Sequence, residues 1–169
     1  MILTQQSQRL WRSDMHITLI AAADDNWGIG LNSHLPWHHK EDLKHFRTRT
    51  MGKDLLVGRT TMETLPPLAG RRIHSLSSQN GDFSSLDVAI SHFKSVPAEE
   101  LIIAGGAKLY ENSLEFCNSA EISRINGIYA CDTFMPDLRS KIGWKLVKIE
   151  EKTPNLKIEY WENECIKSK

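Results

Sequence analysis

Short apolar segments that alternate with helical patterns are the feature that most restricts the fold of this chain. Residues 16–23 begin β-branched and end in small side chains, and residues 54–58 and 100–104 are similarly short and apolar. Continuous apolar runs of this length are typical of strands that are buried on both faces of a sheet. The helical patterns that follow these runs lie at about 39–50, 59–65 and 107–116. This alternation predicts a doubly wound, mostly parallel sheet.

The C-terminal part of the chain has a different pattern. Residues 144–152 and 156–164 flank a turn at 153–155, which predicts an antiparallel hairpin. The remaining elements are expected at 71–76 and 120–129 (strands) and from residue 84 (a helix with a capping serine). We therefore expect an α/β fold whose central sheet has about eight strands, including the antiparallel C-terminal hairpin, with about four flanking helices.

The length of 169 residues suits one domain with a substantial core. Residues 1–14 are polar and lack the apolar segment of a signal peptide, so we expect a flexible, dispensable extension before a single domain at 15–169. The 21 Lys and Arg residues balance the 21 Asp and Glu residues, which leaves no bulk attraction to nucleic acid or to an acidic membrane. No apolar run reaches the roughly 18 residues of a membrane span.

Cysteine and histidine usage gives no sign of a metal centre or of disulfides. The three cysteines, which form no CxxC pair, are Cys117, Cys131 and Cys165. Their odd number fits a reducing cytoplasm. Histidines cluster at 34–39, but Pro36 interrupts any helical spacing and no acidic residue completes a site, so no metal is expected. In the absence of an obvious exposed apolar stripe, we expect a cytoplasmic monomer.

Asp42 is a carboxylate that stands among apolar positions of the predicted helix at 39–50. Leu43 and Phe46 are three residues apart, and Asp42 and Phe46 are four apart, so these residues share one helix face. A carboxylate on an apolar face needs a polar partner or a proton, because burying it bare is too costly. Asp42 is therefore either a group that meets a polar ligand in an apolar pocket or a solvated residue that the helix dipole favours.

Two predicted strand-to-helix junctions have the composition of anion sites. They are Gly58-Arg59-Thr60-Thr61 and Gly105-Gly106-Ala107-Lys108. A helix N-terminus offers unpaired N–H groups, and glycines let a phosphate approach the backbone. Two such junctions would hold both phosphates of a dinucleotide, and Arg59 with Ser77 and Ser78 would suit an extra phosphate. The alternative for the glycine pair is a simple tight turn, and the GxGxxG fingerprint is absent.

The order of motifs along the chain resembles that of dihydrofolate reductase over about residues 16–163. Each motif is weak alone, but together, in this order and spacing, they are highly specific. The motifs are Ile20-Ala21-Ala22, Gly28-Ile29-Gly30, Leu35-Pro36-Trp37, Asp42-Leu43 with Phe46, Gly58-Arg59-Thr60-Thr61, Leu68-Ala69-Gly70-Arg71, Ser77-Ser78, Ile103-Ala104-Gly105-Gly106-Ala107-Lys108-Leu109-Tyr110 and Asp132-Thr133-Phe134-Met135-Pro136. The resemblance implies NADPH-dependent reduction of 7,8-dihydrofolate to tetrahydrofolate, in support of one-carbon and nucleotide synthesis.

The resemblance also implies roles for residues around the substrate. Asp42 would bind the pterin ring and help a water-mediated proton to reach its nitrogen. Trp37 would help to hold that water, and Leu35 would lie on a mobile lid formed by residues 24–38. Arg71 would pair with the α-carboxylate of the substrate glutamate. The implied substrate-binding residues are Ile20, Ala22, Asp42, Leu43, Phe46, Arg71 and Ser123, and the implied catalytic residues are Asp42, Trp37 and Leu35.

NADPH is the cofactor that the resemblance implies. Arg59, Ser77 and Ser78 would recognise the 2′-phosphate, which favours NADPH over NADH. The family has a cis peptide bond between two glycines that correspond to Gly105 and Gly106. The implied cofactor-binding residues are Ala22, Ile29, Gly30, Gly58, Arg59, Thr60, Thr61, Ser77, Ser78, Gly105, Gly106, Ala107, Lys108, Leu109 and Tyr110.

Two other functions stay open at the level of sequence. One is a related pterin or flavin-precursor reductase, and the other is a non-catalytic binding protein that kept the fold. Asp42 together with Arg71 favours folate, because a glutamate tail needs a cation. Ser123 stands where the family usually has threonine, and Trp27 is unexpected in the lid. The expected partner is a small-molecule substrate, with neither nucleic acid nor membrane.

Overall fold

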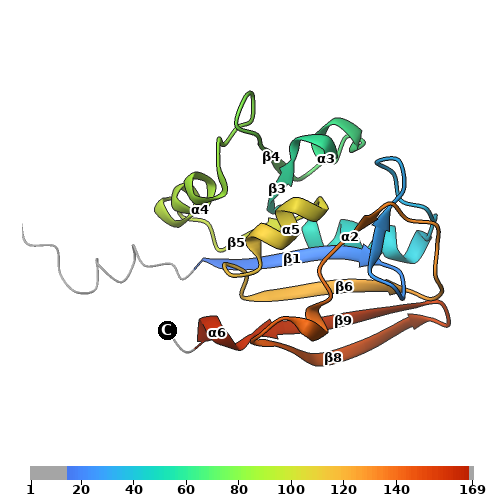
Figure 1. Ribbon diagram of the computed structural model, residues 1–169. Helices are drawn as coiled ribbons and strands as arrows, with labels where there is room; N and C mark the ends of the chain where they lie inside the picture. Colours follow the sequence, from blue (N-terminus) through green and yellow to red (C-terminus); the bar gives the residue numbers. More distant parts are fainter. Residues whose placement is uncertain (1–14, 168–169) are drawn as a thin grey trace, which may run out of the picture.

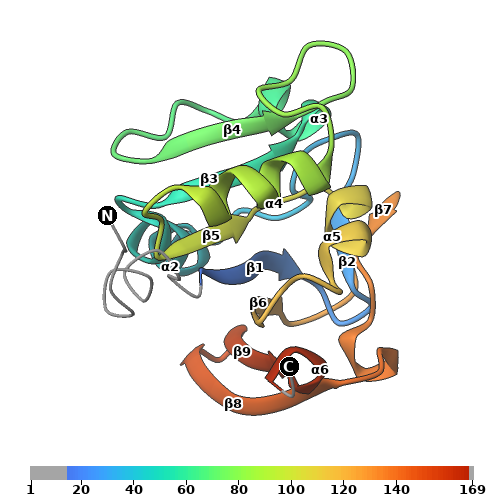
Figure 2. The ribbon, with the colours of Figure 1, turned by 90° about the vertical axis from the view of Figure 1, so that its left-hand side faces the viewer.

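A computed structural model describes residues 15–167 as an α/β fold built around a seven-stranded sheet (Figure 1). The strand order is β4-β3-β5-β1-β6-β9-β8, which Figure 2 shows from top to bottom. The strands are β1 His16–Ala23, β3 Asp54–Gly58, β4 Arg72–Leu76, β5 Glu100–Ile103, β6 Ser119–Ile125, β8 Trp144–Thr153 and β9 Leu156–Asn163. The helices in this part of the chain are α2 Lys40–Thr50, α3 Arg59–Thr64, α4 Leu86–Ser95, α5 Ala107–Ser113 and α6 Glu164–Lys167, with a 3-10 turn at Leu138–Ser140.

The pairing directions confirm a mostly parallel sheet. Strand β1 pairs in parallel with β5 on one side and with β6 on the other. Strand β3 pairs in parallel with both β4 and β5. Strand β9 runs antiparallel to β6 and β8, so the predicted C-terminal hairpin forms the antiparallel edge. The carboxyl ends of the five parallel strands therefore meet at one edge, where ligands bind in sheets of this kind.

The long loop after β1 contains a strand that the sequence pattern did not predict. Strand β2, Gly28–Gly30, pairs antiparallel with β7, Thr133–Phe134, in a separate two-stranded sheet. The strands are thus divided into a sheet of seven and a pair, whereas the sequence suggested one sheet of about eight. Strands of two or three residues are too short to show the alternation on which such predictions depend.

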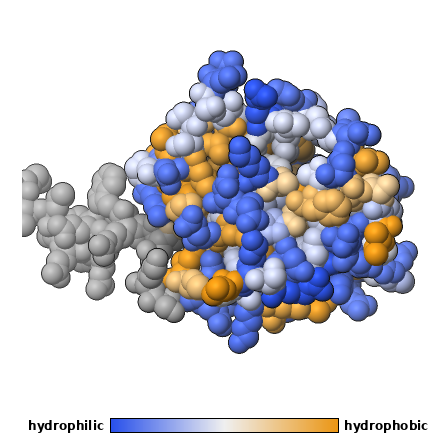
Figure 3. All heavy atoms as spheres, in the orientation of Figure 1, coloured by the Kyte–Doolittle hydropathy of each residue, from blue (hydrophilic) through white to orange (hydrophobic). Residues whose placement is uncertain are grey.

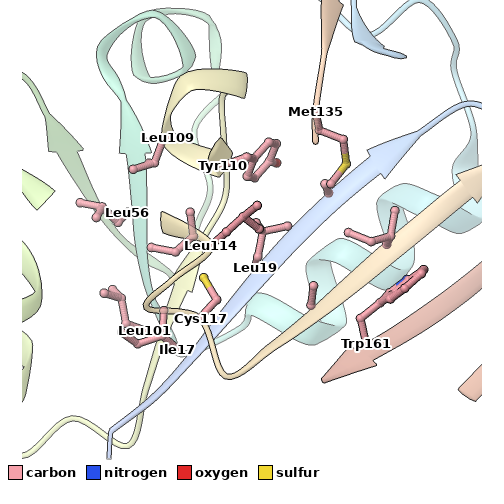
Figure 4. Close-up of a cluster of buried hydrophobic side chains, with 14 of the residues drawn as sticks. Ile17, Leu19, Leu56, Leu101, Leu109, Tyr110, Leu114, Cys117, Met135 and Trp161 are labelled. Carbon is pink, nitrogen blue, oxygen red and sulfur yellow. The ribbon is translucent and has the colours of Figure 1, made fainter. Parts of the chain in front are cut away.

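Side chains along β1 alternate between two apolar layers. Ile17 and Leu19 belong to the larger core, which α4 and α5 cover, and Figure 4 shows Leu19 close to Tyr110 and Leu114. Ile20 belongs instead to a cluster against which Phe46 of α2 packs. Because successive side chains of a strand point to opposite faces, α2 covers the face of the sheet opposite to α4 and α5.

Two predicted elements are longer than the observed ones because hydrogen bonds turn the chain before the predicted ends. The strand predicted to reach residue 129 ends at Ile125, and Gly127 has a φ of +105°. The Gly127 N–H donates to Asp25 Oδ2 at 2.7 Å, so the chain turns toward the lid. Helix α5 ends at Ser113, whose carbonyl accepts the N–H groups of Phe116 and Cys117 at 2.9 and 3.1 Å.

The described chain has a mainly hydrophilic face (Figure 3), free cysteines and no membrane-spanning helix. The face in Figure 3 is mainly hydrophilic, with apolar side chains in small separate groups. Within residues 15–167, no helix combines the length and the apolarity that crossing a membrane requires. The three cysteines are free. The extension expected at residues 1–14 lies outside the described residues.

Candidate active site

Asp42 lies in the first turn of α2, and its side chain meets that of Ser123 on β6. The residue is only 6% exposed, so the alternative of a solvated aspartate is wrong. Burial raises the pKa of Asp42, while interaction with the Ser123 hydroxyl and the charges of His45 and His39 lower it in part. A buried carboxyl group balanced in this way is typical of a functional site, because it can both hold a proton and accept hydrogen bonds from a ligand.

The surroundings of Asp42 are apolar and come from β1 and α2. Ile20 is buried, and Phe46 packs against its cluster. Ala22 is half-buried and, two residues after Ile20, lies on the same face of β1. Leu43 is 46% exposed, so its side chain is available to a ligand rather than packed in the core.

Arg71 and its neighbour Arg72 differ in their partners. Arg72 donates to both carboxylate oxygens of Asp54, at 2.9 Å from Nε and 2.7 Å from Nη2. The Nε and Nη1 atoms of Arg71 are buried and have no hydrogen-bond partner among the described residues. Because buried donors without an acceptor are costly, the Arg71 guanidinium fits the binding of an anionic ligand group.

The segment expected to form the lid, residues 24–38, carries an exposed leucine and a half-buried tryptophan. Leu35 is 47% exposed. Trp37 packs edge-on against Tyr129, with ring centroids 5.2 Å apart, and its Nε1 is buried without a partner in the described chain. The indole N–H only donates, so this position suits a water or a ligand acceptor. In β2, Ile29 is half-buried and Gly30 is buried.

The two glycine-containing junctions lie side by side. The Gly58 N–H donates to the Gly105 carbonyl at 2.8 Å, and the Gly105–Gly106 peptide bond is cis, as the resemblance implied. A Cβ added at Gly106 would lie 3.2 Å from Thr61 Oγ1, so this hydroxyl faces the glycine pair. The Tyr110 hydroxyl donates to the Ile20 carbonyl at 2.8 Å and ties α5 to β1. In the rest of α5, Ala107 is half-buried, Lys108 exposed and Leu109 buried.

The side chains expected at the extra phosphate also come together. Gly58 pairs with Leu76 in the register of β3 and β4, so the residues that follow, Arg59 and Ser77, are neighbours. Arg59 is exposed and faces Glu63 at 3.7 Å. An exposed ion pair of this kind is weak, so the guanidinium remains available to a ligand. Thr60 and Ser78 are exposed, and Ser77 is half-buried.

Several residues that hold the site were missed by the sequence analysis. Asp24 is fully buried and accepts hydrogen bonds from the N–H groups of Asn26, Gly28 and Tyr129 at 2.8–2.9 Å. It joins the start of the lid to the segment after β6. The available signal was the acidic pair Asp24-Asp25 directly after the first strand, but the most distant partner of Asp24 lies 105 residues away.

Trp27, which the sequence analysis noted only as unexpected in the lid, is the second residue whose role was missed. It has a φ of +62° and is 4% exposed. The Arg124 guanidinium lies 4.0 Å from the Trp27 ring centroid, and the Trp161 ring packs edge-on at 6.3 Å. A cation over an indole face is favourable, so Trp27 fixes the part of the lid around it, the lid base, to the sheet.

The third missed feature is the pair formed by His45 and Glu121, next to Asp42. His45 Nε2 lies 3.4 Å from Glu121 Oε2, and Arg49 Nε donates to Glu121 Oε1 at 2.6 Å. The sequence signal was the spacing of 42, 45 and 49 along one helix, but only the structure shows that β6 supplies the carboxylate. As to metals, no group of His, Cys, Asp or Glu in residues 15–167 has an arrangement that could hold an ion.

Comparisons with known proteins agree with this geometry. The family described as "Dihydrofolate reductase" matches residues 16–163. A dihydrofolate reductase of Neisseria gonorrhoeae is 34% identical over 134 residues, which cover 73% of this chain and 81% of that protein. A dihydrofolate reductase type 3 of Salmonella typhimurium is 36% identical over 140 residues, covering 78% and 84%. The solved dihydrofolate reductase of Enterococcus faecalis, complexed with NADP(H) and RAB-propyl, is similar with a TM-score of 0.75 at 26% identity, over 87% of this chain and 95% of that one. The chain described here belongs to the dihydrofolate reductase family.

Proposed function

We propose that the protein reduces 7,8-dihydrofolate to 5,6,7,8-tetrahydrofolate with NADPH. The observation that carries this proposal is the buried carboxyl group of Asp42, which lies on an apolar floor at the ligand-binding edge of the sheet. Membership of the dihydrofolate reductase family supports the same reaction. The protein would act as a cytoplasmic monomer in one-carbon metabolism and nucleotide synthesis, with a single catalytic domain at 15–169.

The substrate would lie between β1 and α2. Asp42 would accept hydrogen bonds from the ring amide and the 2-amino group of the pterin, so that the ligand satisfies the buried carboxylate. Ile20, Ala22, Leu43 and Phe46 would form the apolar walls. Ser123 would keep the hydroxyl contact with Asp42, since serine retains the group that threonine offers. Arg71, whose Nε and Nη1 have no partner in the described part of the chain, would bind the glutamate α-carboxylate.

The residues at the two junctions fit a dinucleotide phosphate. A Cβ at Gly106 would approach Thr61 Oγ1 to 3.2 Å, so glycine leaves more room beside the backbone there than a larger residue would. Arg59 would pair with the 2′-phosphate, assisted by Ser77 and Ser78. The proposed cofactor contacts are Ala22, Ile29, Gly30, Gly58, Thr60, Thr61 and the segment Gly105, Gly106, Ala107, Lys108, Leu109 and Tyr110. NADPH would supply the hydride.

The chain itself would align the ring, exclude water and deliver a proton. Asp42 would orient the pterin and favour its protonated form electrostatically. The Nε1 of Trp37, which has no partner among residues 15–167, would hold the water that carries the proton to the ring nitrogen. Leu35, at the exposed part of the lid, would close over the nicotinamide side and exclude bulk water.

The test is the loss of NADPH absorbance after addition of 7,8-dihydrofolate to the wild type and to Asp42→Asn. We expect turnover in the wild type and a loss of at least about a hundredfold in the variant at neutral pH, since general acid–base groups typically contribute this much. Asp87→Asn, an exposed position in α4, is the matched control and should keep full activity. A wild-type protein that binds NADPH but does not reduce dihydrofolate would refute the proposal.

A further inference from the structure

We propose that His45 is a positioning residue whose imidazole, facing Glu121 beside Asp42, tunes the protonation of the Asp42 carboxyl group and thereby the pH range in which the protein reduces dihydrofolate. This inference rests on the proposed function and goes beyond it, because it assigns a role to a residue outside the substrate and cofactor contacts. Three observations carry it: the spacing along α2, the facing carboxylate on β6, and the charge balance of the surrounding groups.

The geometry places two pairs of side chains opposite each other. Asp42, His45 and Arg49 are separated by three and four residues, so they lie along one face of α2. Glu121 and Ser123 are two residues apart and therefore lie on one face of β6. Ser123 meets Asp42, while Glu121 Oε2 lies 3.4 Å from His45 Nε2.

The partners of Glu121 leave one oxygen for the histidine. Arg49 Nε donates to Oε1 at 2.6 Å, whereas Oε2 and His45 Nε2 are both buried and form no hydrogen bond in the described chain. The two side chains are only 11–13% exposed. A small movement would make this contact a charge-assisted hydrogen bond, because a protonated imidazole donates from both nitrogens.

Charged groups from several elements surround His45. Arg49 and Lys53 are the cations, and Asp42, Glu100 and Glu121 are the carboxylates, so the ionised set has one more negative than positive charge. Two further groups face this set. Tyr160 of β9 is kept neutral, because burial and its hydrogen bond to Glu150 raise its pKa to about 12, and His39 faces Asp42 from the start of α2.

His45 acts on the reaction through Asp42. Burial raises the pKa of Asp42, and the Ser123 interaction, His45 and then His39 oppose that rise. Within residues 15–167 His39 forms no ion pair with a carboxylate, whereas His45 Nε2 lies 3.4 Å from Glu121 Oε2. Removing the His45 charge would therefore raise the pKa of Asp42 further, so that Asp42 would hold its proton to higher pH.

The direction of the effect on turnover follows from the stoichiometry. The reaction adds one hydride from NADPH and one proton from solvent to 7,8-dihydrofolate, and gives tetrahydrofolate and NADP+. Its rate falls at high pH, where the pocket no longer holds the proton. In His45→Gln the pH of this fall should move upward by about half a unit or more, since one nearby charge at intermediate dielectric is worth this much.

The experiment follows the Asp42 carboxyl carbon by 13C NMR through a pH titration and measures the pH profile of single-turnover reduction. We expect both midpoints to move upward in His45→Gln and to stay unchanged in His92→Gln, an exposed histidine of α4 on the opposite face of the sheet. His45→Lys restores a positive charge and should bring the Asp42 midpoint back to the wild-type value or below it. This second variant separates charge from packing and remains informative if the glutamine variant folds poorly.

The outcomes separate the two proposals. An Asp42 titration that is the same in the wild type and His45→Gln, or one that His45→Lys shifts in the same direction as glutamine does, would overturn the role of His45. A wild-type protein without turnover would refute the proposed function, and the NMR titration would still decide whether His45 controls Asp42.

Discussion

The buried carboxylate of Asp24 offers the sharpest test of how the lid is held. Its Oδ1 accepts the N–H groups of Asn26 at 2.9 Å and Gly28 at 2.8 Å, and its Oδ2 accepts that of Tyr129 at 2.9 Å. The residue has no exposed surface. In Asp24→Asn the remaining oxygen can keep the first two donors, but the new amide group would point its own N–H groups at the Tyr129 N–H.

The cost can be estimated from these contacts. The variant loses one hydrogen bond to a charged acceptor, which is worth about 1.5–3 kcal/mol, and weakens two others by removing their charge. The Tyr129 donor also loses its acceptor. We expect the free energy of unfolding to fall by about 3 kcal/mol. For a chain of this size that corresponds to a melting temperature lower by about 6–12 °C.

Urea unfolding of the wild type, Asp24→Asn and Asp25→Asn is the appropriate assay. Asp25 accepts one backbone N–H, from Gly127 at 2.7 Å, and an asparagine keeps one oxygen for it. Its variant should therefore lose about 1 kcal/mol or less. Equal losses in the two variants, or a loss below about 1 kcal/mol in Asp24→Asn with an unchanged slope, would refute this reasoning.

Three further predictions concern the arginines and the buried charges. Arg59→Ala should weaken NADPH binding at least about tenfold and NADH binding far less, as measured by fluorescence titration, because only NADPH carries the 2′-phosphate; equal losses would count against this contact. Arg71→Ala should raise KM for dihydrofolate at least about tenfold with little change in kcat, and a pterin substrate without a glutamate should show no such difference. Burial opposes ionisation of Glu100, but hydrogen bonds from Arg49 and Thr18 outweigh it and lower its pKa to about 2. The ionised Glu100 therefore stabilises the fold above pH 4.5, and this contribution is lost as the pH falls toward 2. In Glu100→Gln the free energy of unfolding should fall by about 1–2 kcal/mol less than in the wild type over this pH range, after discounting for solvent screening. The same pH dependence in both proteins would contradict this.

The elements that depend on local pattern were predictable from the sequence. The strand at 54–58 and the helix with the Ser85 cap agree with the structure, where Ser85 Oγ accepts the Val88 N–H at 3.3 Å. The burial of Asp42 was one of two alternatives, and the cis bond at Gly105–Gly106 came from the resemblance. These features depend on residues close in sequence or on motifs with a fixed meaning.

The parts that failed depend on partners far away in the chain. Strand β2 exists because β7 pairs with it, and Asp24 is buried because Tyr129, 105 residues later, donates to it. His45 has a role only because β6 brings Glu121 opposite α2. No periodicity or local propensity records such a pairing, since each side chain would suit a solvated position equally well.

The Trp27–Trp161 pair gives the protein a built-in optical signal. Two indoles whose centroids are 6.3 Å apart, at an interplanar angle of 61°, couple their electronic transitions and give a paired positive and negative band in circular dichroism. One ring belongs to the lid base and the other to β9. The intensity of this couplet therefore reports whether the lid base stays docked while ligands enter, without any label and in the unmodified protein.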